Sequence, residues 1–371
     1  MRKIFQEEFY KIASRKLVWI GLFCLLVFVR YRLAMLEDEY AMTIGGETIW
    51  GKEAIVRDQE LAAQYAGPLT EEKVQNIYEQ YGFFYRNRKT GEQNGNYCSR
   101  FITERMTNSR QLDEPALEDI QFYQGADWEN NAGPLLEDGL RFDYVYGWED
   151  LAETYGIMVV LGLSVIFIIG LSSVFSEEYS LKTADILLTT RRGKGSGIWI
   201  KAAAAFGFTV TVFLAVTFYV WAIYLKVFGT QGLDASAVMI RWGSSFGYCP
   251  DTVGGFLLFQ FWLGLAGTIL LTAIVLAASA LCKNAFLAVV LSLVLYLIPV
   301  VWLKILGPMR IFGYTATKAV SHFMVSMPVY LSMGWDFGFP ADQMAMHLAI
   351  ALAVGAAGVG LGCRRYRGYQ G

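Results

Sequence analysis

Residues 155–175 read YGIMVVLGLSVIFIIGLSSVF, an uninterrupted run without a charged side chain. A helix rises about 1.5 Å per residue, so about 20 apolar residues cross the hydrocarbon core of a bilayer, which is about 30 Å thick. The run therefore predicts a membrane-spanning helix. The charged stretch that follows it leads, at Lys201, into a second long apolar run, and this repeated pattern decides the fold class.

The composition of the whole chain also indicates a membrane protein. Of its 371 residues, 55% are hydrophobic and only 17% are charged, whereas a soluble domain carries about a quarter charged residues. Four further stretches are long and apolar enough to span a bilayer without interruption. They are 198–225, 254–281, 285–306 and 344–362.

A sixth span is predicted at 17–36, where the apolar run is shorter. The run Leu17–Val29 is followed closely by Arg30 and Arg32. A basic start before a short apolar run is also typical of a secretory signal peptide, but no clear small-residue cleavage site comes next. We therefore expect a retained helix whose arginines reach the membrane interface or face the protein interior.

The charges of the chain are segregated along the sequence. Residues 37–153 contain 24 acidic and 10 basic side chains, a net charge of −14, while the rest of the chain carries +12. The short basic segments all fall on one side of a six-span layout, and the positive-inside rule assigns that side to the cytoplasm. The predicted cytoplasmic segments are 1–16, 176–197 and 363–371, and the predicted external segments are 37–153, 226–253 and 307–343.

The expected fold class is thus an all-α polytopic membrane protein with six spans and cytoplasmic termini. A mainly α extracytoplasmic domain lies between the first two spans. One of its helices is legible in residues 67–82, GPLTEEKVQNIYEQYG, where Thr70 can cap the start and Gly82 the end. The apolar segment 307–343 predicts short re-entrant or interfacial helices that end at prolines. Those prolines are Pro328 and Pro340.

The stretch 175–201 reads FSEEYSLKTADILLTTRRGKGSGIWIK and predicts an amphipathic helix. Glu177 and Glu178 stand at its expected start, where negative charge meets the positive end of the helix dipole, and Glu178 can pair with Lys182 one turn later. The apolar face consists of Leu181, Ala184 and Leu188, with Leu187 beside it. Such a face lies either on the lipid surface or in a groove of another protein.

The first 16 residues repeat this design. The spacing of Phe5, Phe9 and Ile12 puts them on one face of a helix, and charged residues occupy the other face. The charged residues are Lys3, Glu7, Lys11 and Arg15. Two amphipathic elements are therefore expected on the cytoplasmic side of a bundle that has no soluble domain there.

The pattern F-x-E-E-Y-x-x-x-T-x-D-x-L-L, followed by basic residues and a lysine that opens the next span, resembles the cytoplasmic loop of ABC-2-type transporter permeases. The large insertion between the first two spans resembles one subgroup of that family. The matching positions are Glu177, Glu178, Thr183, Leu187, Leu188 and Lys201. The family often has a proline after the two leucines, where this chain has TTRR, and this departure leaves the end of the helix undefined.

The resemblance implies a subunit of an ATP-driven exporter. The loop would form a coupling helix on a separate ATPase dimer, which binds ATP and Mg, with coupling residues Glu177, Glu178, Leu181, Thr183, Leu187 and Leu188. A second permease copy, as homodimer or heterodimer, would complete the pathway in a bacterial plasma membrane. No cofactor is expected on this chain, because RRGKGSG has leucine where a phosphate-binding loop needs its first glycine.

The sequence offers few other site residues. Arg30 and Arg32 could meet an anionic cargo or simply snorkel to the interface. Gln260, Thr268 and Thr272 could line the pathway or form helix–helix hydrogen bonds. Catalytic residues, metal ligands and a nucleic-acid site are not expected. The spacing of Cys98 and Cys249 does not support the external disulfide that the topology allows.

Two other functions stay open at this point. A membrane sensor or accessory protein would bind a ligand through the external domain. A secondary transporter would need ionisable groups inside the membrane, for which His347 is the main candidate, although a lone histidine is more often packed than functional.

Overall fold

The computed structural model describes residues 1–86, 93–112, 116–190, 195–240, 250–309, 313–333 and 341–368. Within these residues, six helices are long and apolar enough to cross a membrane, in agreement with the prediction of a helical, multi-pass membrane protein. Five are α2 (Lys16–Glu39), α11 (Ser196–Phe228), α12 (Val253–Leu281), α13 (Ala285–Val301, continued by the π-helical turn Trp302–Leu306) and α17 (Ala341–Arg367). The remaining one is composite.

The second span in the sequence joins four helical pieces. They are α7 (Tyr146–Glu153), a π-helical turn (Thr154–Val159), α8 (Val160–Leu171) and α9 (Ser173–Ser180). The span therefore continues beyond Phe175, where the sequence placed its end. At the other end of the chain, α17 runs through Arg367, so much of the predicted tail 363–371 is helical.

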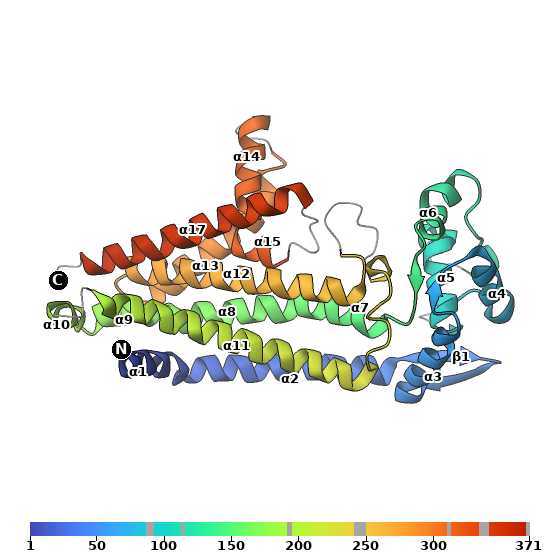
Figure 1. Ribbon diagram of the computed structural model, residues 1–371, viewed down its shortest axis with the longest axis horizontal. Helices are drawn as coiled ribbons and strands as arrows, with labels where there is room; N and C mark the ends of the chain where they lie inside the picture. Colours follow the sequence, from blue (N-terminus) through green and yellow to red (C-terminus); the bar gives the residue numbers. More distant parts are fainter. Residues whose placement is uncertain are drawn as a thin grey trace.

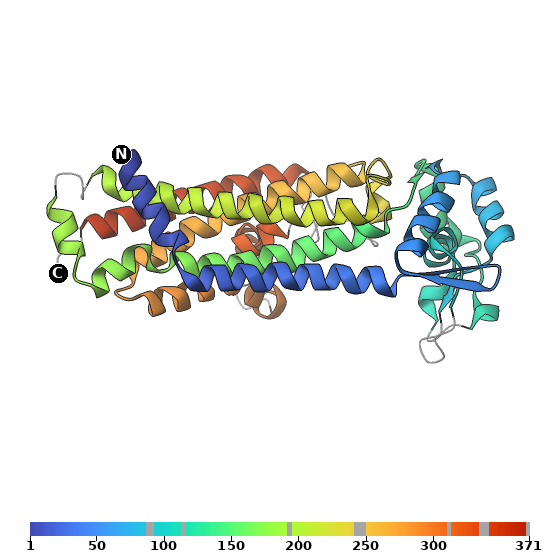
Figure 2. The ribbon, with the colours of Figure 1, turned by 90° about the horizontal axis from the view of Figure 1, so that it is seen from below.

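Helix α12 lies at the centre of the bundle and contacts α8, α11, α13 and α17 (Figure 1). In the most apolar stretch of α12, 61% of the residues are buried within the chain. The same fraction is 11% in the most apolar stretch of α17. The apolar side chains that α2, α13 and α17 leave uncovered would face hydrocarbon in a bilayer. The N-terminus and the end of α17 lie at the same end of the elongated bundle (Figures 1 and 2).

The described residues between 41 and 145 form a compact block at the opposite end of the bundle (Figure 1). Its helices are α3 (Gly51–Gln64), α4 (Glu71–Tyr81), α5 (Tyr97–Met106) and α6 (Gly133–Glu137), with short helical turns at Asn108–Gln111, Leu117–Asp119 and Trp128–Ala132. Three antiparallel strand pairs join them: β1 (Ala41–Ile44) with β2 (Glu47–Trp50), β3 (Gly67–Pro68) with β6 (Arg141–Phe142), and β4 (Tyr85–Arg86) with β5 (Gln93–Asn94).

The helix predicted in this block is confirmed as α4. The Thr70 side chain accepts a hydrogen bond from the backbone N–H of Lys73, and Gly82 ends the helix with φ +68°. Cys98 is buried on α5 without a disulfide. Cys249, the other cysteine of the external side in the predicted topology, lies outside the described residues.

The described part of the apolar segment before α17 contains two helices, α14 (Tyr314–Val325) and α15 (Pro328–Ser332). Pro328 begins α15 instead of ending a helix, because a proline fits the first helical position, where its missing N–H is not needed. Pro340 lies outside the described residues. A Cβ on Gly267 of α12 would lie 2.8 Å from the Cβ of Ser332, so this glycine lets α15 pack directly against the central helix.

Outside the block, a single short turn is described between α11 and α12, at Ala237–Met239. A short helix, α1 (Arg2–Ala13), precedes the first span, and α10 (Ala184–Thr189) follows α9. Both lie at the end of the bundle away from the block (Figure 2). The residues of the predicted N-terminal amphipathic helix and of the predicted coupling loop lie on or next to α1, α9 and α10.

Candidate functional site

The helix is interrupted between α9 and α10. The prediction of one helix starting at Glu177 is therefore wrong. The N–H of Thr183 donates to the carbonyl of Glu178 and the N–H of Lys182 to that of Tyr179, the hydrogen-bond pattern of a Schellman motif. Lys182 occupies its left-handed position with φ +55°, where glycine is usual. Glu177 and Glu178 therefore lie in the last turn of α9, at the negative end of its dipole.

A buried ion pair compensates for this unfavourable placement. Glu178 pairs with Lys201 at the start of α11, and the two residues are 8% and 7% exposed. The other carboxylate oxygen of Glu178 accepts a hydrogen bond from the hydroxyl of Tyr366 on α17. Lys201 also lies 3.6 Å from Glu8 of α1. The predicted pair with Lys182 is thus replaced by contacts that join four helices.

A second ion pair ties the N-terminal segment to α9. The guanidinium of Arg15 lies 2.9 Å from Glu177 and donates to the carbonyl of Gly170 at 2.7 Å. Burial lowers the pKa of Arg15, and the charge of Glu177 acts in the opposite direction. Because Arg15 contacts both α8 and α9, it holds the start of α2 against the turn that separates them.

The apolar face of α1 packs on α11 within the same chain. Ile12 is buried, and the ring of Phe9 lies 5.7 Å from that of Phe208, centroid to centroid. Phe5 passes over Gly207, whose added Cβ would lie 3.3 Å from the Phe5 ring. This face is therefore covered at least in part by the chain itself.

Hydrogen bonds also connect the backbone of α9 to the central helix α12. The N–H groups of Phe175 and Ser176 lie at the break between α8 and α9, and both donate to the hydroxyl of Ser279 on α12, at 2.9 and 3.2 Å. The hydroxyl of Tyr179 donates to the carbonyl of Ala280 at 3.1 Å. Helix α9 is consequently fixed to the central helix on one side and to α11 and α17 on the other.

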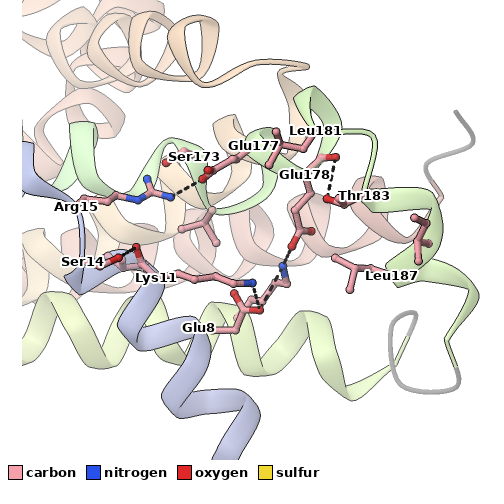
Figure 3. Close-up of a pocket in the computed structure, with 14 residues that line it drawn as sticks. Glu8, Lys11, Ser14, Arg15, Ser173, Glu177, Glu178, Leu181, Thr183 and Leu187 are labelled. Atoms are coloured by element: carbon pink, nitrogen blue, oxygen red, sulfur yellow. Dashed lines mark hydrogen bonds and ion pairs between the residues drawn. The ribbon is translucent and has the colours of Figure 1, made fainter.

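These elements enclose a cavity of about 590 Å³ between α1, α9, α10 and α11. Figure 3 shows charged side chains from α1 and α9 meeting across it, with Leu181 and Leu187 nearby. Its charged lining residues are Glu8, Lys11, Arg15, Glu177, Glu178 and Lys201. The hydroxyl of Thr183, also at the cavity, lies 3.4 Å from the carbonyl of Glu178.

Three apolar side chains remain exposed around α10, and we call them the α10 knob: Leu181, Ile186 and Leu187. Their exposed fractions are 65%, 68% and 37%. Ala184 and Leu188, which the sequence placed on the outer apolar face, are buried instead. The sequence pattern alone does not point to Ile186, because its place on the outer face depends on the break at Lys182, which no glycine signals.

The residues predicted to line a pathway lie away from the α10 knob and do not converge. Arg32 pairs with Asp150 at 2.7 Å, and Arg30 is exposed beside a separate cavity near the block. Gln260 donates to the carbonyl of Ala152 at 2.7 Å. The Thr272 hydroxyl lies 2.8 Å from the carbonyl of Thr268, within hydrogen-bond distance, and 3.1 Å from the hydroxyl of Thr209. The contacts of Gln260 and Thr272 join helices, so a role in the pathway stays a prediction.

His347 is buried and hydrogen-bonded to Ser326 at 2.8 Å, with the His322 ring 5.8 Å away. In the described part of the chain, no group of three or more His, Cys, Asp or Glu side chains could hold a metal ion. The site at α10 thus combines exposed apolar side chains with a cluster of charged residues around a cavity.

Comparison of the chain with models of protein families, with curated proteins and with solved structures gives no match.

Proposed function

We propose that the chain is the membrane-spanning permease subunit of an ATP-driven exporter. A separate ATPase dimer binds ATP and Mg and contacts the α10 knob on the cytoplasmic side. A second permease copy supplies the other half of the pathway. The observation that carries this proposal is the α10 knob itself: exposed apolar side chains at the end of a spanning helix, tied by buried charges to two further spans.

The buried contacts suit transmission of force. A displacement of α10 reaches Glu178 through the short break after α9, and Glu178 contacts α11 through Lys201 and α17 through Tyr366. Separating a buried carboxylate from its partner costs free energy. The helices α9, α11 and α17 are therefore displaced together more easily than they are displaced relative to one another. Closure of the ATPase dimer would in this way tilt several spans at once and switch the bundle between occluded and outward-open states.

The cargo is proposed as hydrophobic, within the range of a peptide antibiotic, a drug or a lipid-like molecule. A cavity of about 450 Å³ between α11, α12, α15 and α17 supports this choice, because its lining side chains are apolar. Leu270, Leu348 and Leu352 are among them. The cavity lies on the spans, where a hydrophobic molecule could enter from the bilayer.

The test is a pull-down from native membranes. The tagged full-length chain is isolated, and the amount of ATPase that stays bound to it is measured. Ile186→Glu places a charge on the α10 knob at a position that is 68% exposed, so it leaves the core intact. Leu117→Glu is the matched control, since Leu117 is 46% exposed in the block at the other end. We expect the wild type and the control to retain the ATPase, and Ile186→Glu to lose it.

Two results would contradict the proposal. One is an ATPase that remains bound to Ile186→Glu with unchanged substrate-stimulated turnover. The other is transport by the purified chain in vesicles without any second polypeptide, which would favour a secondary transporter. Labelling of an Ile186→Cys variant in intact cells gives an independent check, because the proposed topology protects this position from reagents that do not cross the membrane.

A further inference from the structure

A groove on the outer surface of the bundle adjoins the candidate site. It encloses about 620 Å³ between the start of α2, the junction of α8 and α9, and the start of α13. It shares Arg15, Ser173, Glu177 and Leu181 with the cavity at the α10 knob. Figure 2 shows these three elements together at the end of the bundle that carries α1.

The groove is amphiphilic along the direction of the spans. Its apolar wall includes Leu17, Ile169 and Phe286, of which Leu17 and Phe286 are 68% and 74% exposed. Its polar end carries Lys16, the first residue of the α2 span, and Arg15 immediately before it. Large apolar side chains exposed beside a pair of basic residues match a molecule with a hydrocarbon chain and an anionic head.

The position of the basic residues fixes which part of such a molecule they meet. Lys16 begins the apolar helix α2, so its ammonium lies at the level where hydrocarbon gives way to headgroups. A basic pocket between spanning helices at this level binds acidic lipid headgroups, and each basic side chain near an acidic membrane surface adds about 1 kcal/mol. The described lining contains one acidic residue, Glu177, which pairs with Arg15 at 2.9 Å.

We propose that this groove binds one anionic phospholipid. Its acyl chain lies against Leu17, Ile169 and Phe286, and its phosphate contacts Lys16 and competes with Glu177 for Arg15. Glu177 is 53% exposed at its side chain, against 22% for Arg15, so the carboxylate can turn to water when a phosphate replaces it. The lipid would thereby reach the ion pair that holds α2 to α9.

This proposal requires only that the chain is inserted in a bilayer, and it does not depend on an ATPase partner. The assay is retention of lipid by the purified full-length chain after extraction from vesicles of phosphatidylcholine mixed with phosphatidylglycerol, read by native mass spectrometry. We expect bound phosphatidylglycerol in excess of its share of the vesicle, and less of it as the salt concentration rises.

Three variants distinguish lipid binding in the groove from a general attraction of anionic lipid to basic side chains on the surface. Lys16→Gln should weaken phosphatidylglycerol retention about fivefold, the factor expected for one basic side chain at the surface. Lys3→Gln removes the same charge from an exposed position of α1 outside the groove and should have no effect. Glu177→Gln should strengthen retention, because it removes the carboxylate that competes for Arg15.

A fourth variant, Ala285→Phe, adds a large apolar side chain to the groove wall without changing its charge. It should abolish retention by filling the space for the acyl chain. The proposal is overturned if phosphatidylglycerol and phosphatidylcholine are retained in proportion to their amounts. Equal effects of Lys16→Gln and Lys3→Gln also overturn it, as does retention that Ala285→Phe leaves unchanged. Soluble glycerol phosphate that displaces the lipid completely at low concentration would mean an anion site only.

Discussion

Replacing Lys201 with methionine should destabilise the protein strongly, because Glu178 would keep a buried charge without its partner. Both side chains are about nine-tenths buried, with exposed fractions of 9% for Lys201 and 10% for Glu178. Removing one partner of such a pair costs about 3–5 kcal/mol, whereas replacing both by apolar side chains of similar volume is often neutral. The Tyr366 hydroxyl continues to donate to Glu178 in the variant, which places the expected loss at the lower end, about 3 kcal/mol.

The assay is a double-mutant cycle on the free energy of unfolding, measured by denaturant titration in one detergent. The variants are Lys201→Met, Glu178→Leu and the double substitution. Either single change should lower the stability by about 3 kcal/mol, and the double variant should recover most of that loss. Additive losses would show that the two residues do not depend on each other. An unchanged stability in Lys201→Met would refute the reasoning outright.

Two other substitutions test separate parts of the structure. Burial raises the pKa of Asp58 from 3.8 to about 6, against hydrogen bonds from Tyr40 and the Tyr97 N–H that act in the opposite direction. The folded block therefore binds more protons than the unfolded chain between about pH 4 and 6, and its stability should fall by about 3 kcal/mol as the pH rises through that range. Thermal unfolding across this range should show the slope in the wild type and not in Asp58→Asn; equal slopes would exclude Asp58 as its source. Lys182→Gly should raise the stability by about 1 kcal/mol, since φ is +55° at Lys182 and glycine adopts such angles without strain. Chemical denaturation checks this, with Lys182→Ala as the control that keeps the strain and should bring no gain.

The sequence was most informative where a short segment decides its own structure. The spanning helices follow from runs of about 20 apolar residues, because each must satisfy its backbone hydrogen bonds internally and bury its side chains in hydrocarbon. Helix α4 follows from Thr70 and Gly82, whose caps act within one turn. The spacing of Phe5, Phe9 and Ile12 predicts the apolar face of α1. It does not predict that α11 covers this face.

The sequence was misleading where a local pattern competed with contacts between distant segments. Glu177 and Glu178 suit the start of a helix, yet Lys201 and Arg15 compensate for their charges and allow them to end α9. The break at Lys182 has no glycine to signal it. As a result, the outer face of α10 presents Ile186 and not Leu188.

The sequence by itself determined that this is a helical, multi-pass membrane chain, because hydrophobicity and charge act along short stretches and do not depend on the packing partner. Only the tertiary structure decided what the end of the bundle presents. Glu178 meets Tyr366, a residue 188 positions away, because both helices pack around α12, and nothing within either segment specifies that meeting. The break at Lys182 that follows this contact leaves Leu181, Ile186 and Leu187 exposed as the α10 knob.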